Sequence, residues 1–206
     1  MDIEHFFISE GLSEKKFWDA NEYIYWKLLS QRSFFIDFEI DDAYCLMELA
    51  KSIILMNEEE KDIENPEPIK LWIHSYGGDL DQAMFFCDLV QSSRIPIITI
   101  ATGSAMSAGF LIFLSGHKRY CFSHTQFLVH KGSAEFSGTA DQIDMAQKNY
   151  KKNIARMRDY ILNRTNITAQ LFNKRSKDDW YIIGEDIIKY GIADKVITDL
   201  KEIQWI

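Results

Sequence analysis

Segment 103–109 combines residues that could do nucleophilic chemistry. It has the sequence Gly-Ser-Ala-Met-Ser-Ala-Gly and directly follows an apolar stretch typical of a buried strand. A strand that turns into a helix through small residues can present a serine hydroxyl and free backbone N–H groups to the same space. Around Ser107 the pattern is that of a Gly-x-Ser-x-Gly turn without its first glycine. Taken alone, the segment favours a tight turn with a packing role over a nucleophile.

Segment 73–79, with the sequence Ile-His-Ser-Tyr-Gly-Gly-Asp, also lies at the end of an expected strand. Its adjacent glycines, Gly77 and Gly78, can adopt backbone conformations that present N–H donors to a ligand or an oxyanion. An ordinary glycine turn has the same composition. The pattern is neither Gly-x-Gly-x-x-Gly nor a phosphate-binding loop followed by lysine, which argues against a nucleotide site.

His130 ends a third apolar strand and is well placed to act as a base, although a single histidine is more often a structural polar residue. His74 precedes the glycine pair and could line the same cleft. The other histidines have contexts less typical of a site: His5, His117 and His124. No histidines or cysteines have the spacing of metal ligands, so we expect no metal and no other cofactor.

These three segments should meet, because the carboxyl ends of parallel strands lie at one edge of a sheet. A loop of N–H donors, a serine at a helix start and a histidine at a strand end are the components of acyl transfer. The remaining requirement is a carboxylate that orients the imidazole. Asp178 and Asp179, later in the chain, both qualify.

The elements that position these residues alternate between strands and helices. We expect helices at 13–29, 42–56, 80–93, 107–114, 140–163 and 185–190. We expect strands at 33–40, 69–74, 95–101, 118–122, 127–130 and 195–198, a small-residue turn at 102–107 and an acidic loop at 57–68. This alternation predicts an α/β fold with a largely parallel sheet. Without repeats or an internal linker, residues 1–206 are expected to form a single domain.

The composition excludes several classes of protein. The 206 residues carry 23 Lys and Arg against 31 Asp and Glu, and 47 % are hydrophobic, which excludes a disordered chain. A net charge of −8 argues against nucleic-acid binding. The longest apolar run, 108–114, is too short to cross a membrane, and the acidic start is not a signal peptide. Cys45, Cys87 and Cys121 form no disulfide framework, so we expect a soluble cytoplasmic protein.

Taken together, these residues resemble the Clp protease proteolytic subunit family, serine peptidases of the crotonase-like superfamily. The similarity runs from about Tyr23 to Thr198. The matching segments are 24–29, 34–40, 73–78, 103–109, 129–130, the long helix after Gly138, and 185–194. Their shared order and spacing make the resemblance specific.

The resemblance assigns roles to eight residues. Ser107 matches the nucleophile, His130 the general base and Asp179 the acid that orients it. Gly78 and Ala108 match the backbone N–H donors of the oxyanion hole. The residues that would bind the substrate backbone are Gly77, Lys131 and Gly132. The order Ser…His…Asp differs from that of the α/β-hydrolases.

The resemblance also implies a fold and partners. The fold is the crotonase-like spiral of ββα units, with a protruding strand-helix handle over 131–163. Two heptameric rings would stack as a tetradecamer that encloses the active sites and degrades unfolded polypeptides. An AAA+ unfoldase is the further implied partner, although residues 1–22 do not resemble the family's axial N-terminal loop.

Several positions depart from the family pattern. Tyr76 replaces the proline of Ser-Pro-Gly-Gly, Met106 replaces a small residue before the nucleophile, and Lys131-Gly132 replaces Gln-Pro after the histidine. The loop between Ser107 and His130 is also slightly short. Two alternatives therefore stay open: a catalytically impaired partner or regulatory subunit of a mixed ring, and a crotonase-type acyl-CoA enzyme.

Overall fold

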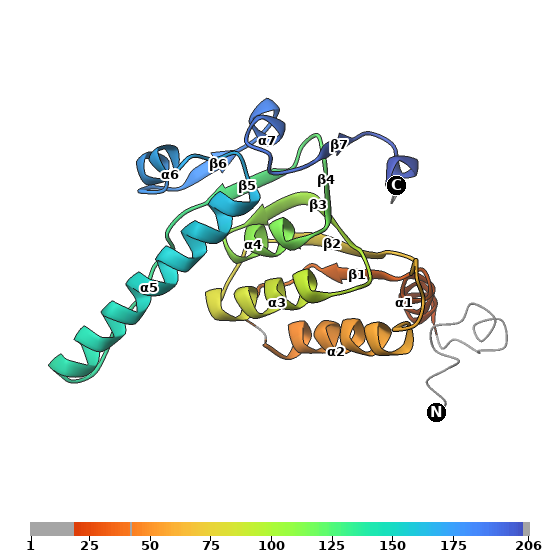
Figure 1. The fold of residues 1–206 in the computed structure, drawn as a ribbon, viewed down its shortest axis with the longest axis horizontal. Helices are drawn as coiled ribbons and strands as arrows, with labels where there is room; N and C mark the ends of the chain where they lie inside the picture. The colour runs from red at the N-terminus through yellow and green to blue at the C-terminus, as the bar shows by residue number, and fades with distance from the viewer. Residues whose placement is uncertain (1–18, 42, 204–206) are drawn as a thin grey trace.

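A mostly parallel sheet of seven strands organises the protein in the computed structural model, which describes residues 19–41 and 43–203 (Figure 1). The strands are β1 (Ser33–Ile36), β2 (Ile69–Ser75), β3 (Ile97–Met106), β4 (Lys118–Phe122), β5 (Gln126–Val129), β6 (Trp180–Ile182) and β7 (Lys195–Ile197). Their order is β1-β2-β3-β4-β7, and β5 pairs with both β3 and β6. Every pairing is parallel except that of β5 with β6. The predicted α/β class is confirmed.

Helices follow most of the strands. They are α1 (Ala20–Ser30), α2 (Ala43–Glu59), α3 (Leu80–Ser92), α4 (Ala108–Ser115), α5 (Ala140–Arg164), α6 (Ala169–Arg175) and α7 (Glu185–Lys189), with a 3-10 turn at Leu200–Glu202. Side-chain oxygens cap four of the helix N-termini: those of Asp19, Asp79, Thr139 and Thr168. Each accepts a backbone N–H that the helix itself leaves without a partner.

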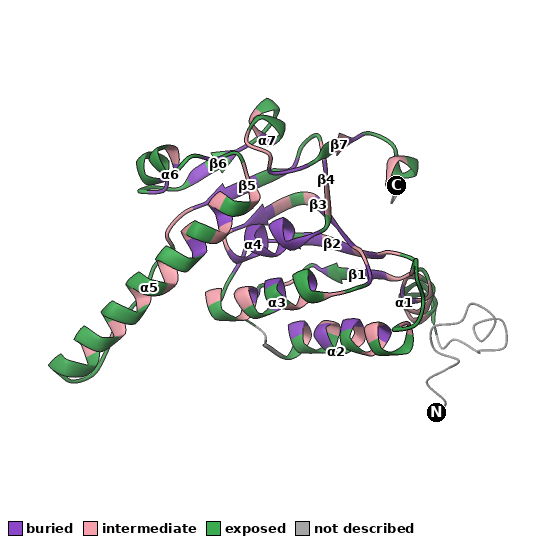
Figure 2. Ribbon diagram, viewed as in Figure 1, coloured by how far each residue is buried: buried purple, intermediate pink, exposed green. Residues whose placement is uncertain are grey.

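Apolar side chains of α2, α3 and α4 pack on one face of the sheet and form the main core. On β2, Ile69, Leu71 and Ile73 point into this core, and the residues between them are only partly buried. A second, smaller cluster covers the opposite face of the sheet and contains Ile98, Ile100, Tyr120 and Ile197. The central strand β3 is therefore covered on both faces, as its nearly unbroken apolar sequence predicts (Figure 2).

Strand β3 changes partners along its length. Its first half pairs with β4, from Ile98 to Ala101, and its second half pairs with β5, from Ser104 to Met106. The prediction of a turn at 102–107 is therefore wrong, because β5 supplies a backbone partner that the local sequence does not reveal. As a result, Ser107 follows directly on the end of a strand.

Helix α5 projects away from the rest of the protein (Figure 1). Of its 25 residues only Met157 and Ile161 are buried, and both lie in its C-terminal half. Segment 131–138 connects β5 to α5, and the Tyr150 hydroxyl donates a hydrogen bond to the Lys131 carbonyl at 3.0 Å. The handle is therefore a helix with a connecting segment, and no strand is assigned over 131–139. A strand needs a backbone partner, and the backbone groups inside a helix are already paired.

Other boundaries also differ from those predicted. The first strand ends at Ile36, although Ile40 still forms a single bridge with Gly78. Helix α2 continues to Glu59, and α6 and β6 were not predicted. The predicted helix at 13–29 is observed from Ala20, and its first part, like most of segment 1–22, lies outside the described residues.

His117 pairs with the start of β3 and should make stability depend on pH. Its ring Nδ1 accepts the Ile97 N–H at 3.0 Å, and its backbone N–H donates to the Ile97 carbonyl at 2.8 Å. Burial lowers the pKa of His117 from its ordinary value, and the charge of Arg164 lowers it further. The unfolded chain therefore takes up the proton first, so the free energy of unfolding should fall as the pH drops from about 6.5 towards the folded-state pKa.

Urea unfolding at about pH 7.5 and about pH 5.5 measures this loss. The variant His117→Gln keeps an acceptor at this position but does not titrate, so it should lose less stability than the natural protein over the same interval. Equal losses in the two proteins would contradict the assignment.

Candidate active site

Ser107 occupies a strained turn between β3 and α4. Its backbone has φ 51° and ψ −118°, a conformation that residues other than glycine rarely adopt. The surrounding chain holds this conformation: the Ser107 N–H donates to the Leu128 carbonyl at 3.0 Å, and the Ser107 carbonyl accepts from Phe110 and Leu111. Strain of this kind persists where neighbours over-determine the backbone, and it is concentrated at functional sites.

Aromatic packing joins the helix that follows Ser107 to the strand that precedes His130. Phe110 and Phe113 of α4 lie 5.8 and 4.8 Å, centroid to centroid, from Phe127 of β5. All three side chains are buried. Helix α4 and strand β5 are therefore held side by side.

The pairing of β5 with β6 brings a carboxylate to His130. In this antiparallel ladder Val129 lies opposite Trp180, so the next pair along it is His130 and Asp179. The His130 Nδ1 lies 3.3 Å from the Asp179 Oδ1, and its Nε2 lies 2.7 Å from the Ser107 Oγ. The register thus selects Asp179, which the residues alone did not distinguish from Asp178.

These three side chains form a continuous chain of polar contacts. His130 is partly buried, with 28 % of its side chain exposed, whereas Asp179 is 57 % exposed. A serine hydroxyl on one imidazole nitrogen and a carboxylate on the other is the arrangement that activates a serine nucleophile.

The glycine pair lies against the same turn. A Cβ added at Gly77 would lie 2.7 Å from both the Met106 carbonyl and the Ser107 Cβ, and 3.1 Å from the Ala108 nitrogen. Only glycine allows this approach, and its φ of 108° also requires glycine. Ile40 donates to the Gly77 carbonyl at 2.7 Å and so holds the loop from its other side.

Two backbone donors are available beside Ser107. Among the described residues, no acceptor takes the N–H of Gly78 or that of Ala108. Ala108 is the first residue of α4, where a helix leaves its N–H groups without internal partners. The Ala108 N–H is therefore of the kind that can bind an anion at a helix start.

The other predicted residues lie nearby with different surroundings. Lys131 and Gly132 follow His130, but the Lys131 carbonyl is already occupied by Tyr150. His74 donates through Nδ1 to the Thr102 carbonyl, on the face of β2 opposite Ser75. Within residues 19–41 and 43–203, His74 makes no hydrogen bond to Ser107 or His130.

Residues 19–41 and 43–203 give little support for a metal site, a cysteine nucleophile or a membrane-spanning helix. No group of three or more His, Cys, Asp or Glu side chains there could hold a metal ion. The three cysteines form no disulfide, and burial raises the pKa of both Cys87 and Cys121 to about 12, which makes these two thiols poor nucleophiles at neutral pH. No helix in that part of the chain is long and apolar enough to cross a membrane.

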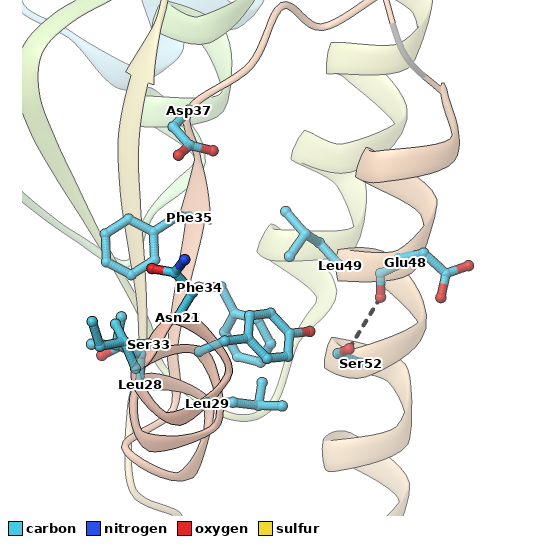
Figure 3. Close-up of a pocket in the computed structure, with 12 residues that line it drawn as sticks. Asn21, Leu28, Leu29, Ser33, Phe34, Phe35, Asp37, Glu48, Leu49 and Ser52 are labelled. Carbon is cyan, nitrogen blue, oxygen red and sulfur yellow. Dashed lines mark hydrogen bonds between the residues drawn. The ribbon is translucent and has the colours of Figure 1, made fainter. Parts of the chain in front are cut away.

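A separate groove lies between α1, β1 and α2 (Figure 3). Its lining is largely apolar and includes Ile24, Tyr25, Leu28, Phe34, Phe35 and Leu49. Ser107, His130 and Asp179 do not line it, so it is distinct from the candidate active site.

The close packing at Gly77 predicts a specific loss of stability. Gly77→Ala should lower the free energy of unfolding by about 2 to 4 kcal/mol, because the methyl group adds a clash with Ser107 to the backbone strain. Gly184→Ala is the matched control: its φ is also positive, at 59°, but nothing lies within 4 Å of an added Cβ. Strain alone should cost the control about 1 to 2 kcal/mol. Denaturant unfolding measures both, and equal losses would contradict the close approach.

Comparison with known proteins identifies the family of this chain. A family model described as Clp protease matches residues 18–200. The ATP-dependent Clp protease proteolytic subunit of Deinococcus radiodurans is 26 % identical over 182 residues, which cover 87 % of this chain and 86 % of that protein. The family model spans Ser107, His130 and Asp179 together with the glycine pair. The chain therefore belongs to the Clp protease family.

Proposed function

We propose that this chain is a serine endopeptidase subunit that hydrolyses peptide bonds through an acyl-enzyme. The observation that carries the proposal is the contact of His130 with both partners: Nε2 with the Ser107 Oγ at 2.7 Å and Nδ1 with the Asp179 Oδ1 at 3.3 Å. Family membership supports a peptidase. The strained turn at Ser107 supports the choice of nucleophile.

In this mechanism His130 Nε2 takes the hydroxyl proton while the Ser107 Oγ attacks the carbonyl carbon of the scissile bond. Asp179 holds the tautomer with its proton on Nδ1 and stabilises the imidazolium that forms. The N–H groups of Gly78 and Ala108 bind the oxyanion of the tetrahedral intermediate. The imidazolium then protonates the leaving amine, and water, activated by the same histidine, releases the acyl group.

The substrate would bind as an extended strand between the glycine loop and the segment that follows His130. Gly77, Lys131 and Gly132 are the proposed backbone contacts, as in strand addition to an open edge. The Tyr150 hydroxyl takes one of the two acceptor positions of the Lys131 carbonyl, so one position remains for the substrate. The pairing with substrate would continue through Gly132.

We further propose that residues 1–206 act as one domain and assemble as two stacked heptameric rings, with 131–163 as the handle between them. The exposure of α5 supports an intersubunit role, since Met145 on it is 71 % exposed. Exposed apolar residues on α2, Tyr44, Met47 and Ile54, are suited to contacts within a ring. Free thiols agree with a cytoplasmic location.

The name of the Deinococcus relative includes ATP-dependent proteolysis, which supports an AAA+ unfoldase as a partner of this chain. The substrates would then be unfolded polypeptides delivered into the ring. A catalytically impaired ring subunit is the competing proposal, motivated by Met106 and Tyr76 beside the site.

Covalent labelling tests the nucleophile. A fluorophosphonate should form one adduct on Ser107 of the assembled protein, located by peptide mass spectrometry, because the probe reacts with a serine activated by a base. Ser107→Ala should abolish the adduct. Ser104→Ala, three residues earlier on β3, is the control and should label normally. An assembled protein without an adduct on Ser107 would reject the peptidase in favour of the impaired subunit.

The orienting acid is tested by a neighbouring pair of variants. Asp179→Asn should lower kcat on a fluorogenic peptide by a factor on the order of 10³ to 10⁴, since the amide favours the wrong imidazole tautomer. Asp178→Asn should retain activity within about threefold, because its side chain lies off the His130 register. If the two variants lose equal activity, Asp179 is not the orienting acid.

A further inference from the structure

The C-terminal end of α4 needs hydrogen-bond donors from outside the helix. Every residue of α4 is buried, and its sequence, Ala-Gly-Phe-Leu-Ile-Phe-Leu-Ser, has one polar side chain, which bonds within the helix. The last carbonyls of a helix have no internal partner, and a buried carbonyl left unpaired costs about 1 to 3 kcal/mol. The carbonyls in question belong to Leu114, Ser115 and Gly116.

Arg164, the last residue of α5, supplies these donors. Its Nε donates to the Leu114 carbonyl, and its Nη2 donates to the carbonyls of Ser115 and Gly116 at 3.1 and 3.0 Å. Its Nη1 also reaches the Gln91 Oε1 of α3 at 3.0 Å. A guanidinium at a helix C-terminus stabilises the helix because its positive charge faces the negative end of the helix dipole. Its donors have a fixed planar arrangement, so they also restrict the positions of the carbonyls that they bind.

The arginine is itself held in place. Arg119 Nη1 donates to the Arg164 carbonyl at 2.8 Å, and Asp194 binds Arg119 through both its backbone N–H and its guanidinium. One turn earlier on α5, the Tyr160 hydroxyl donates to the Leu111 carbonyl at 3.3 Å. Helix α5 is therefore hydrogen-bonded to α4 at two positions, through Tyr160 and Arg164. Arg119 connects these contacts to β4.

The other end of α4 carries the reacting groups. Eight helical residues span about 12 Å, so a shift or rotation at the C-terminal end reaches Ser107 and the Ala108 N–H almost undiminished. The hydrophobic effect that buries such a helix is non-directional. Directional bonds from Arg164 to the last carbonyls, and from the Thr99 Oγ1 to the Phe113 carbonyl at 2.8 Å, therefore add a constraint on where the helix stops.

We propose that Arg164 is a positioning residue for Ser107: it holds α4 so that the hydroxyl stays on His130 and the Ala108 N–H faces the oxyanion. This inference rests on the proposed peptidase function. It assigns a part in the chemistry to a side chain at the far end of the helix, which touches neither substrate nor reacting atoms.

Fluorophosphonate kinetics on the assembled protein test this role. In Arg164→Met the first-order rate of phosphonylation at saturating probe should fall about tenfold or more, since a displacement of about 1 Å can cost 10²-fold. The half-saturating probe concentration should change less than about twofold, because the groups that bind the probe remain. Arg164→Lys keeps the positive charge but lacks the several donors of the guanidinium. Its phosphonylation rate should therefore lie between those of Arg164→Met and the natural protein. Arg158→Met, whose guanidinium binds the adjacent Asp159, should match the natural protein.

Circular dichroism and thermal melting establish that each variant is folded at the assay temperature. If Arg164→Met does not fold, Arg164→Lys decides: slower phosphonylation at unchanged half-saturation supports the inference, and the natural rate overturns it. Folded Arg164→Met that labels at the natural rate also overturns it.

Failure of the proposed function gives a different result, namely no adduct in the natural protein. Amide hydrogen exchange then tests the inference independently. Loss of protection in α4 of Arg164→Met, with α3 unchanged, would support the role of Arg164 in holding the helix. Unchanged protection in both helices would overturn it.

Discussion

One backbone hydrogen bond, from the Ser107 N–H to the Leu128 carbonyl, ties the candidate site together. It holds the end of β3 against β5, and β5 then ends at Val129, directly before His130. The antiparallel pairing of β6 with β5 places Asp179 opposite that histidine. The positions of all three side chains therefore depend on β3 leaving β4 and taking β5 as its new partner.

The same turn limits which residues can surround it. Gly77 must lack a side chain because it lies against Ser107, and Ser107 itself adopts a backbone conformation that suits glycine better. A glycine in place of Ser107 would relieve the strain, but it would also remove the hydroxyl that the proposed chemistry needs. Stability is thus given up at a position where the chemistry needs a side chain, which is the usual pattern at functional sites.

Much of this arrangement could be predicted from apolar runs, because Ser107 and His130 each follow one and parallel strands end at the same edge. The continuation of β3 over 102–106 could not be predicted, because the small residues there have the composition of a turn. Its partner strand, β5, lies further along the chain. Asp178 and Asp179 are equivalent by composition, and the register of the three-residue strand β6 separates them. Nothing in the sequence around Arg164 indicates its role, because its acceptors are backbone carbonyls about fifty residues away in the chain.

Arg164 and the apolar residues of α4 divide two tasks. Phe110 and Phe113 bury large surfaces against β5, which stabilises the fold but tolerates small shifts. Hydrogen bonds do not tolerate such shifts, since their energy falls steeply with distance and angle. A helix with reacting groups at one end therefore benefits from a charged, forked donor at the other. The arginine is only partly buried, and the carbonyls of α4, the Gln91 side chain and the Tyr160 ring compensate the water that its guanidinium loses.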